Sequence, residues 1–137
     1  MNELDTSFKL YKAECPGMPR DHHAIFVETN AHTSGRLFHV TGTIAQGMLY
    51  EEKELKFPDL SYSYENMTLL GAVDEADLDQ FRQICQSIPP PKKQFEGPKR
   101  LDPKEPLRRC QEWTAEAVDA LKIQGVLKAF QTEREDA

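Results

Sequence analysis

The chain has 137 residues, 39% of them hydrophobic, which is the size and composition of one ordinary globular domain with its own core. Acidic residues outnumber basic ones by 23 to 17, and the formal charge of -6 argues against a general affinity for nucleic acid or anionic membranes. No apolar run approaches the roughly 20 residues of a membrane helix, and no signal peptide is evident. The three cysteines suggest no disulfide framework. We therefore expect a single cytoplasmic domain over residues 1–137 with no integral membrane segment.

Alternating or β-branched composition predicts strands in the first half of the chain. The five stretches with this character are 7–13, 22–29, 36–42, 48–56 and 67–73. Stretches rich in proline, glycine or polar residues separate them and predict turns at 15–19 and 30–35 and a loop at 58–66. We therefore expect an α+β fold built on an antiparallel sheet of four to six strands.

Helical periodicity is found twice in the second half. Residues 75–87 place apolar side chains on one face, and Asp74 precedes them as a candidate N-cap. Three consecutive prolines from Pro89 end this helix, and a proline-stiffened connection then crosses the molecule to a second helix that starts at Cys110. Gly125 predicts its end, with one more helical turn over 126–130 and a frayed tail over 126–137.

All four histidines lie between residues 22 and 39, on or near the strands at 22–29 and 36–42. In a hairpin that sets Phe26 opposite His39, His22 and His39 share one face of the sheet. They would then be about four residues, roughly 13 Å, apart, which is too far for direct contact. A tighter turn would bring them opposite each other, and a slip of one residue would exchange His22 for His23.

The segment before Cys110 is locally basic, with Lys92, Lys93, Lys99, Arg100, Lys104, Arg108 and Arg109. We interpret it as a solvated loop whose charges are balanced elsewhere, and a groove for an anionic substrate is the alternative. At the start of the following helix, the thiol of Cys110 would feel the positive end of the helix dipole. The preceding arginines add to that field, so we expect its thiolate to be favoured.

The remaining cysteines and the tryptophan have ordinary structural explanations. Cys15 lies beside a turn and is expected to be a loop or packing residue. Cys85 lies on the apolar stripe of the first helix, and Trp113 follows Cys110 by one helical turn, so both are expected in the core. The four histidines and Cys15 are residue types that can bind zinc. Neighbouring residues on a strand point to opposite faces, however, and the sequence contains no compact ligand pair such as Cys-x-x-Cys. We therefore predict no metal and no cofactor.

A cysteine at a helix start near a histidine on a strand, with a second polar group to orient that histidine, has the layout of a papain-like thiol site. The three stretches 22–27, 36–40 and 109–113 resemble, in that order, the three blocks of the circularly permuted NlpC-type papain-like superfamily. That superfamily includes lecithin–retinol acyltransferase and its relatives, and the chain is also similar to a group of small uncharacterised fungal proteins of the same organisation. It departs from the pattern at Arg109, where the family often has asparagine, and at His23, where an aromatic residue is usual.

This resemblance implies a role for each of three residues. Cys110 corresponds to the nucleophile, His22 to the base and His39 to the residue that orients the base. The implied function is a cysteine-dependent hydrolase or acyl transferase that acts on an amide, ester or thioester of a small molecule or peptide through a covalent acyl-enzyme. The alternative is a non-catalytic domain that keeps the fold and binds a ligand or protein. The choice between His22 and His23 as base, the substrate and the oligomeric state stay open.

Overall fold

The computed structural model describes residues 7–15, 21–30, 34–56 and 66–129, and the predicted turns and loop at 16–19, 31–33 and 58–65 and the tail at 131–137 lie outside these ranges. Its elements are β1 (Ser7–Cys15), β2 (His22–Asn30), β3 (Ser34–Thr43), β4 (Gly47–Lys56), β5 (Asn66–Asp74), the 3-10 turn η1 (Glu75–Asp77), α2 (Leu78–Ser87), β6 (Phe95–Glu96), β7 (Lys99–Arg100) and α3 (Cys110–Ile123). All five predicted strands and both helices are therefore present.

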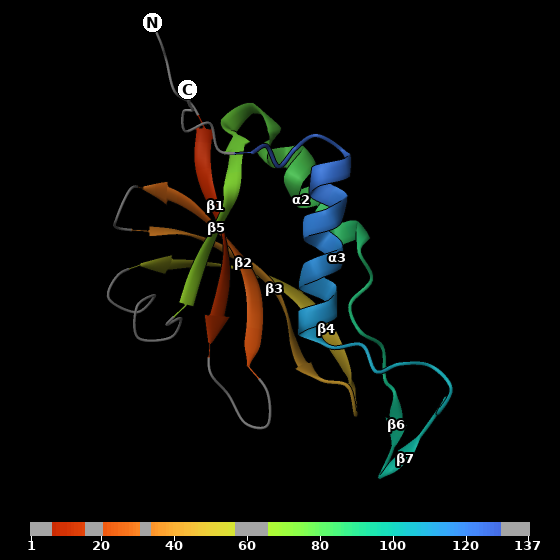
Figure 1. Cartoon of the computed structure of the whole chain (residues 1–137). Helices are drawn as coiled ribbons and strands as arrows, with labels where there is room; N and C mark the ends of the chain where they lie inside the picture. Colours follow the sequence, from red (N-terminus) through yellow and green to blue (C-terminus); the bar gives the residue numbers. More distant parts are fainter. Residues whose placement is uncertain (1–6, 16–20, 31–33, 57–65, 130–137) are drawn as a thin grey trace, which may run out of the picture.

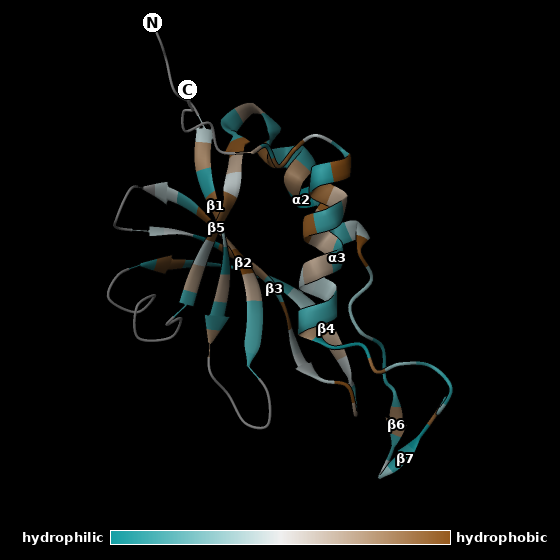
Figure 2. Cartoon of the chain, in the orientation of Figure 1, coloured by the Kyte–Doolittle hydropathy of each residue, from teal (hydrophilic) through white to brown (hydrophobic). Residues whose placement is uncertain are grey.

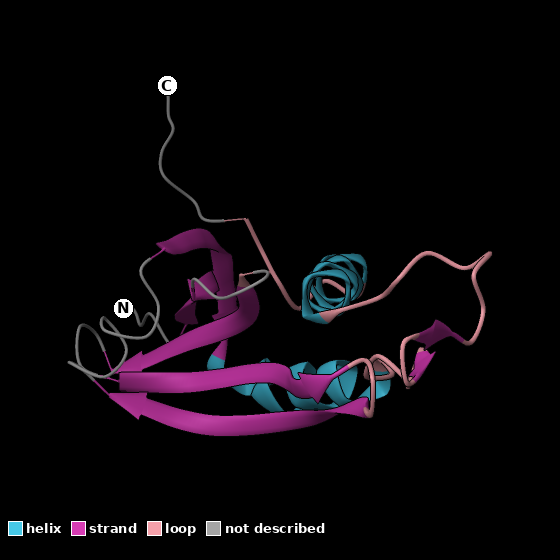
Figure 3. Ribbon diagram, turned by 90° about the horizontal axis from the view of Figure 1, so that it is seen from below, coloured by secondary structure: helices cyan, strands magenta, loops and turns pink. Residues whose placement is uncertain are grey.

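The five long strands form one antiparallel sheet in the order β4-β3-β2-β1-β5. Both α2 and α3 pack on one side of the strongly twisted sheet, and the small β6–β7 hairpin projects from the body on the loop between them (Figures 1 and 3). The prediction of an α+β fold with an antiparallel sheet is confirmed. No helix in the described ranges combines the length and the apolar composition needed to cross a bilayer.

The main core lies between the sheet and the helices because alternate residues of each strand point to opposite faces. On β2, Ile25 and Val27 join this main core, whereas Ala24 and Phe26 belong to a second, smaller cluster on the other face. Trp113 of α3 is fully buried in the main core, as predicted, and its indole Nε1 donates to a backbone oxygen at 3.0 Å. Hydrophilic and hydrophobic bands alternate along α3, as expected of a helix with one buried side (Figure 2).

The predicted helix start at residue 75 is corrected by the structure. One turn of 3-10 helix, η1, precedes α2, and Asp74 makes no side-chain capping bond to it. Its carboxylate instead accepts a hydrogen bond from Lys128 Nζ at 2.7 Å. The Asp74 carboxylate, which the sequence predicted to cap the helix, is therefore part of a long-range ion pair instead.

The prediction of a further helical turn and a frayed tail from residue 126 is wrong for the described residues. Gly125 adopts a φ of 76° and ends the helical path, as expected. Beyond it, Val126 and Leu127 are buried, and the backbone of Lys128 forms a two-bond antiparallel bridge with Ala72 of β5. The apolar pair therefore anchors this segment to the sheet.

Candidate active site

The register between β2 and β3 differs from the expected one and brings two histidines together. Phe26 lies opposite Leu37 rather than opposite His39, so His39 moves two residues closer to His22 along the strands. Their rings meet edge to face with centroids 5.0 Å apart, and His22 Nε2 lies 2.8 Å from His39 Nδ1. The register that sets Phe26 opposite His39 is therefore wrong, and the alternative in which the two histidines come together holds; a bulge between Glu28 and Asn30 contributes to the difference.

A third polar residue, Glu51 on β4, completes this group and was missed by the sequence analysis. It lies opposite His39 in the β3–β4 ladder, and its Oε1 is 2.7 Å from His39 Nε2. Gly42 and Gly47, with φ of 101° and 97°, set the short turn that fixes this register. They were a signal for the turn but not for its register, since a turn centred midway between them would place residue 50 opposite residue 39, whereas Gly42 pairs with Met48 and Glu51 with His39.

Both rings are held in the neutral form by their surroundings. The pKa of His22 is lowered to about 4, mainly by burial and to a smaller extent by His39, His23 and Lys53. Burial also lowers the pKa of His39, against the opposing effect of its hydrogen bond to Glu51. Near neutral pH both are therefore uncharged imidazoles, each with a single N–H.

The hydrogen bonds determine which nitrogen carries that hydrogen. Because the Glu51 carboxylate only accepts, His39 carries its hydrogen on Nε2 and presents a lone pair on Nδ1. His22 must then donate from Nε2, which leaves the lone pair of its ring on Nδ1. We call these three side chains the His–His–Glu chain, and its effect is to make His22 Nδ1 a proton acceptor.

Cys110 is the first residue of α3 and is 7% exposed. Its thiol hydrogen-bonds Gln111 Oε1 at 3.6 Å, and it does not hydrogen-bond the ring of His22. Gln111 Nε2 in turn donates to the backbone oxygen of Asp21 at 2.6 Å, and the backbone N–H of His23 hydrogen-bonds the Cys110 sulfur. The start of α3 is thus attached to β2 on both sides of His22.

The expectation of a favoured Cys110 thiolate is wrong for the structure as described. Burial raises the pKa of the thiol above its usual range, and Glu112 in the first turn raises it further, although backbone N–H groups partly oppose them. The guanidinium of Arg108 turns away to Glu116, with a shortest contact of 2.8 Å. Burial and a nearby carboxylate therefore outweigh the helix dipole.

The sulfur and the imidazoles approach the sheet from opposite sides. Cys110 packs in the main core on the helix side, whereas strand alternation puts His22 on the same face as the second cluster. Pairing between β2 and β3 ends at Ile25–Phe38 in the described residues, although β1–β2 pairing continues to His22. Beyond that point β2 and β3 diverge toward the start of α3 (Figure 1), and the rings of His22 and His39 meet across the space between the two strands.

The other sulfur and imidazole groups have separate environments. His23 Nε2 lies 3.2 Å from a carboxylate oxygen of Glu14, and Cys15, at the end of β1, is half-buried opposite His22 in the β1–β2 ladder. Cys85 is fully buried in the main core, as predicted, and burial raises its pKa to about 12. In the described ranges no group of three His, Cys, Asp or Glu side chains is arranged to hold a metal ion.

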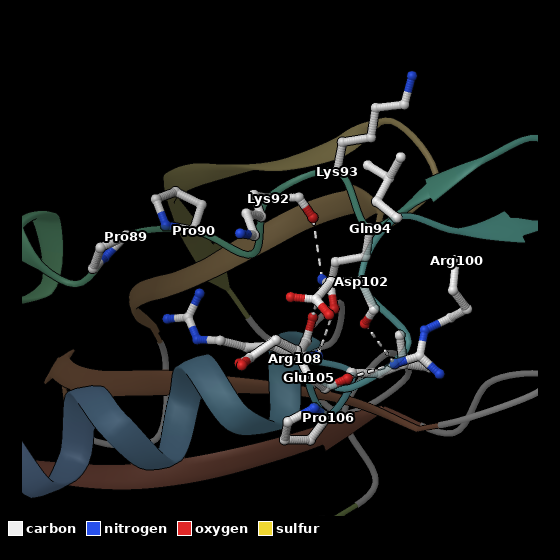
Figure 4. Close-up of a pocket in the computed structure, with 12 residues that line it drawn as sticks. Pro89, Pro90, Lys92, Lys93, Gln94, Arg100, Asp102, Glu105, Pro106 and Arg108 are labelled. Carbon is white, nitrogen blue, oxygen red and sulfur yellow. Dashed lines mark hydrogen bonds between the residues drawn. The ribbon is translucent and has the colours of Figure 1, made fainter.

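A cavity of about 690 Å³ lies just before α3, between the two arms of the loop that joins α2 to α3 (Figure 4). Its lining includes Pro90, Lys92 and Gln94 on the outgoing arm and Leu101 and Arg108 on the returning arm. We call it the loop cavity. It is large enough for a small organic ligand.

Comparison with known proteins places the chain in a family but does not assign an activity. No curated protein and no solved structure matches it significantly. Residues 10–128 match a protein family described as a family of unknown function (DUF6540), and this range contains the His–His–Glu chain, Cys110 and the loop cavity. Since the match covers most of the 137 residues, the chain belongs to the DUF6540 family.

Proposed function

We propose that the protein is a cysteine-dependent hydrolase or acyl transferase of permuted papain-like type, with Cys110 as nucleophile and His22 as base. The observation that carries this proposal is the His–His–Glu chain, which ends on β2 between the two points where the start of α3 is attached. It gives His22 Nδ1 a lone pair, and the backbone N–H of the next residue, His23, hydrogen-bonds the Cys110 sulfur. His39 and Glu51 act as positioning residues, because they fix the ring orientation and tautomer.

The reaction begins with a neutral thiol and a neutral imidazole. When an ester, thioester or amide reaches Cys110, the thiol leaves Gln111, its proton passes to His22 Nδ1 and the sulfur attacks the carbonyl carbon. Backbone N–H groups at Cys110 and His23 stabilise the oxyanion. The leaving group takes the proton from His22, and water or another acceptor then cleaves the thioester. The substrate is a small molecule or peptide.

The state of the sulfur atoms supports a proposal for the compartment. Cys15, Cys85 and Cys110 form no disulfide with one another in the structure. A cysteine nucleophile with two further thiols is suited to a reducing compartment. We therefore propose that the protein acts in the cytoplasm.

Acylation by activated esters and thioesters tests the function. We expect intact-protein and peptide mass spectrometry to detect one acyl group, on Cys110, after brief exposure to p-nitrophenyl acetate or an acyl thioester. Cys110→Ser should not form the thioester, and His22→Ala should slow acylation by about 10²-fold or more. Cys15→Ala is the matched control and should acylate at the wild-type rate. Labelling of Cys15 in place of Cys110, or an unaffected rate in His22→Ala, contradicts the assignment.

The role of Glu51 has a readout that does not depend on turnover. In ¹³C- and ¹⁵N-edited NMR spectra of the imidazoles, we expect His39 and His22 in the Nε2–H form near neutral pH. Glu51→Ala should mix the tautomers of both rings, whereas Glu51→Gln, which can still accept a hydrogen bond, should restore them in part. An Nδ1–H form of His22 in the wild-type protein contradicts the proposed direction of proton transfer.

A second function, a non-catalytic binding domain, is favoured by one observation. The thiol of Cys110 has a raised pKa and is held by Gln111, and the pKa of His22 is about 4, so no preformed thiolate–imidazolium pair exists. A domain of this kind would bind a ligand or protein beside these residues. It predicts no acylation of Cys110 by any ester or thioester tested.

A further inference from the structure

We propose that the loop cavity is the substrate-binding site of the thiol centre and that it selects a small organic anion, a carboxylate or phosphate with an apolar portion. This inference rests on the proposed function, because it assigns the cavity to the reaction at Cys110. It favours the anionic groove over the solvated loop for the basic segment of the sequence.

The position of the cavity connects it to the thiol. Its returning arm runs directly into α3, and Arg108, which lines the cavity, precedes Cys110 by two residues. At 3.8 Å between successive Cα atoms, the two Cα atoms are at most about 7.6 Å apart. The cavity therefore borders the backbone that leads into the start of α3, where Cys110 lies.

The cavity is preformed because its two arms are fixed to each other and to the sheet. Gln94 Nε2 donates to the Arg108 backbone oxygen at 2.7 Å, and the Arg108 backbone N–H donates to Gln94 Oε1 at 2.8 Å. The backbone N–H groups of Gln94 and Met48 donate across the loop–sheet boundary to Ile44 and Pro91. A ligand that enters this site does not have to order the loop, and preorganisation of this kind favours affinity.

Cations outnumber carboxylates in the lining, in contrast to the acidic chain as a whole. Of the four cations, two have carboxylate partners outside the lining: Lys93 pairs with Glu96 and Arg108 with Glu116, each at 2.8 Å. The Lys93–Glu96 pair is exposed to solvent and exchanges easily, so a ligand anion can compete for Lys93. Arg108 contacts both carboxylate oxygens of Glu116 and is the less available of the two cations.

The other two cations have no carboxylate partner within the described part of the chain. Lys92 forms no ion pair there, and Arg100 Nη2 donates to the backbone oxygens of Asp102 and Glu105. The lining contains two carboxylates, but that of Asp102 accepts a hydrogen bond from the backbone N–H of Lys104. The lining has four cations against two carboxylates, Asp102 and Glu105, and this excess of positive charge favours an anion.

The rest of the lining defines the neutral part of the ligand. Pro89, Pro90, Leu101, Pro106 and Leu107 surround the cations with apolar surface, and Leu101 is 54% exposed. Apolar walls exclude water and strengthen the attraction between opposite charges. A fully hydrated inorganic ion would gain little here, so we expect an anion that also has an alkyl or aryl group.

Binding can be measured without catalysis. We expect hexanoate and hexyl phosphate to shift ¹H–¹⁵N resonances of residues 92–108 in the full chain, with 1-hexanol and hexylammonium as controls that bind more weakly. Which anion binds more tightly distinguishes a carboxylate from a phosphate ligand. Lys92→Gln should weaken anion binding about threefold, whereas Lys99→Gln, an exposed position on β7 outside the lining, should not. Cys110→Ala should bind like wild type. Anions that bind no better than hexanol, or that shift other regions, overturn the proposal.

The link to the thiol is tested by alkylation with charged and neutral reagents. The ratio of the iodoacetate rate to the iodoacetamide rate should be higher at Cys110 than at Cys15. It should fall about threefold in Lys92→Gln and stay unchanged in Lys99→Gln. A ratio at Cys110 that is insensitive to Lys92 overturns the assignment of the cavity to the thiol. Anion binding without acylation of Cys110 would instead reject the proposed function and leave the anion site in place.

Discussion

His22, the proposed base, is half-buried and should make the free energy of unfolding depend on pH. The variant His22→Gln separates its contribution from those of other groups. The pKa of His22 is about 4 in the folded protein and 6.5 in its unperturbed state. Between these values the unfolded chain binds more protons than the folded one, so the free energy of unfolding rises with pH across this window. The contribution of His22 to the free energy of unfolding is lost as pH falls from about 6.5 to 4. The full shift corresponds to about 3.4 kcal/mol, and we reduce it to about 1.5 kcal/mol because the side chain is only half-buried.

Urea unfolding at closely spaced pH values from 7.5 to 4.5 measures this difference. Carboxylates and His39 titrate in both proteins, so the informative quantity is the wild-type free energy of unfolding minus that of His22→Gln at each pH. We expect this difference to become less favourable to wild type by about 1.5 kcal/mol as pH falls. The amide side chain of the His22→Gln variant is neutral throughout and can still donate to His39. Parallel curves for the two proteins would refute a lowered His22 pKa and, with it, the neutral resting site.

Substitutions at three further positions test the packing around the site. Thr114 is 1% exposed with no hydrogen-bond partner for its hydroxyl in the structure, so Thr114→Val should raise the free energy of unfolding by about 1 kcal/mol in urea titrations. Trp113→Ala should lower it by about 3–5 kcal/mol, since the ring is fully buried, and Trp113→Phe should recover part of that loss. Gly35→Ala would drive a Cβ into the Val27 backbone oxygen, so we expect a midpoint of thermal unfolding several degrees lower; an unchanged midpoint would contradict the close approach of β2 and β3.

Local sequence was sufficient for the elements and for much of the core. The strand at 22–29 was predicted from its branched residues, and the helix from Cys110 onward was predicted from its helical spacing. Both patterns are short-range and do not depend on the rest of the chain. The buried positions of Trp113 and Cys85 followed from the same periodicity. These features were correct because each depends on a single helix or strand.

The site was only partly predictable because its properties arise between elements. A shift of two residues in the β2–β3 register determines whether His22 and His39 touch, and composition does not specify where a polar turn reverses the chain. Glu51 belongs to a strand whose charged residues looked equivalent until the ladder placed one of them opposite His39. The raised pKa of Cys110 reflects burial by residues distant in sequence, which the arginines beside it do not reveal.

The bridge between Lys128 and Ala72 affects how the protein behaves beside other copies of itself. β4 and β5 are the two edges of the sheet, where exposed backbone N–H and C=O groups invite strand addition and aggregation. The segment after α3 occupies part of the β5 edge through Lys128, and the loop before α3 occupies part of the β4 edge through a bond from Met48 N–H to Pro91. The segments on either side of α3 thus also cover part of both edges. Removal of the residues from 126 onward would expose β5 and promote edge-to-edge association.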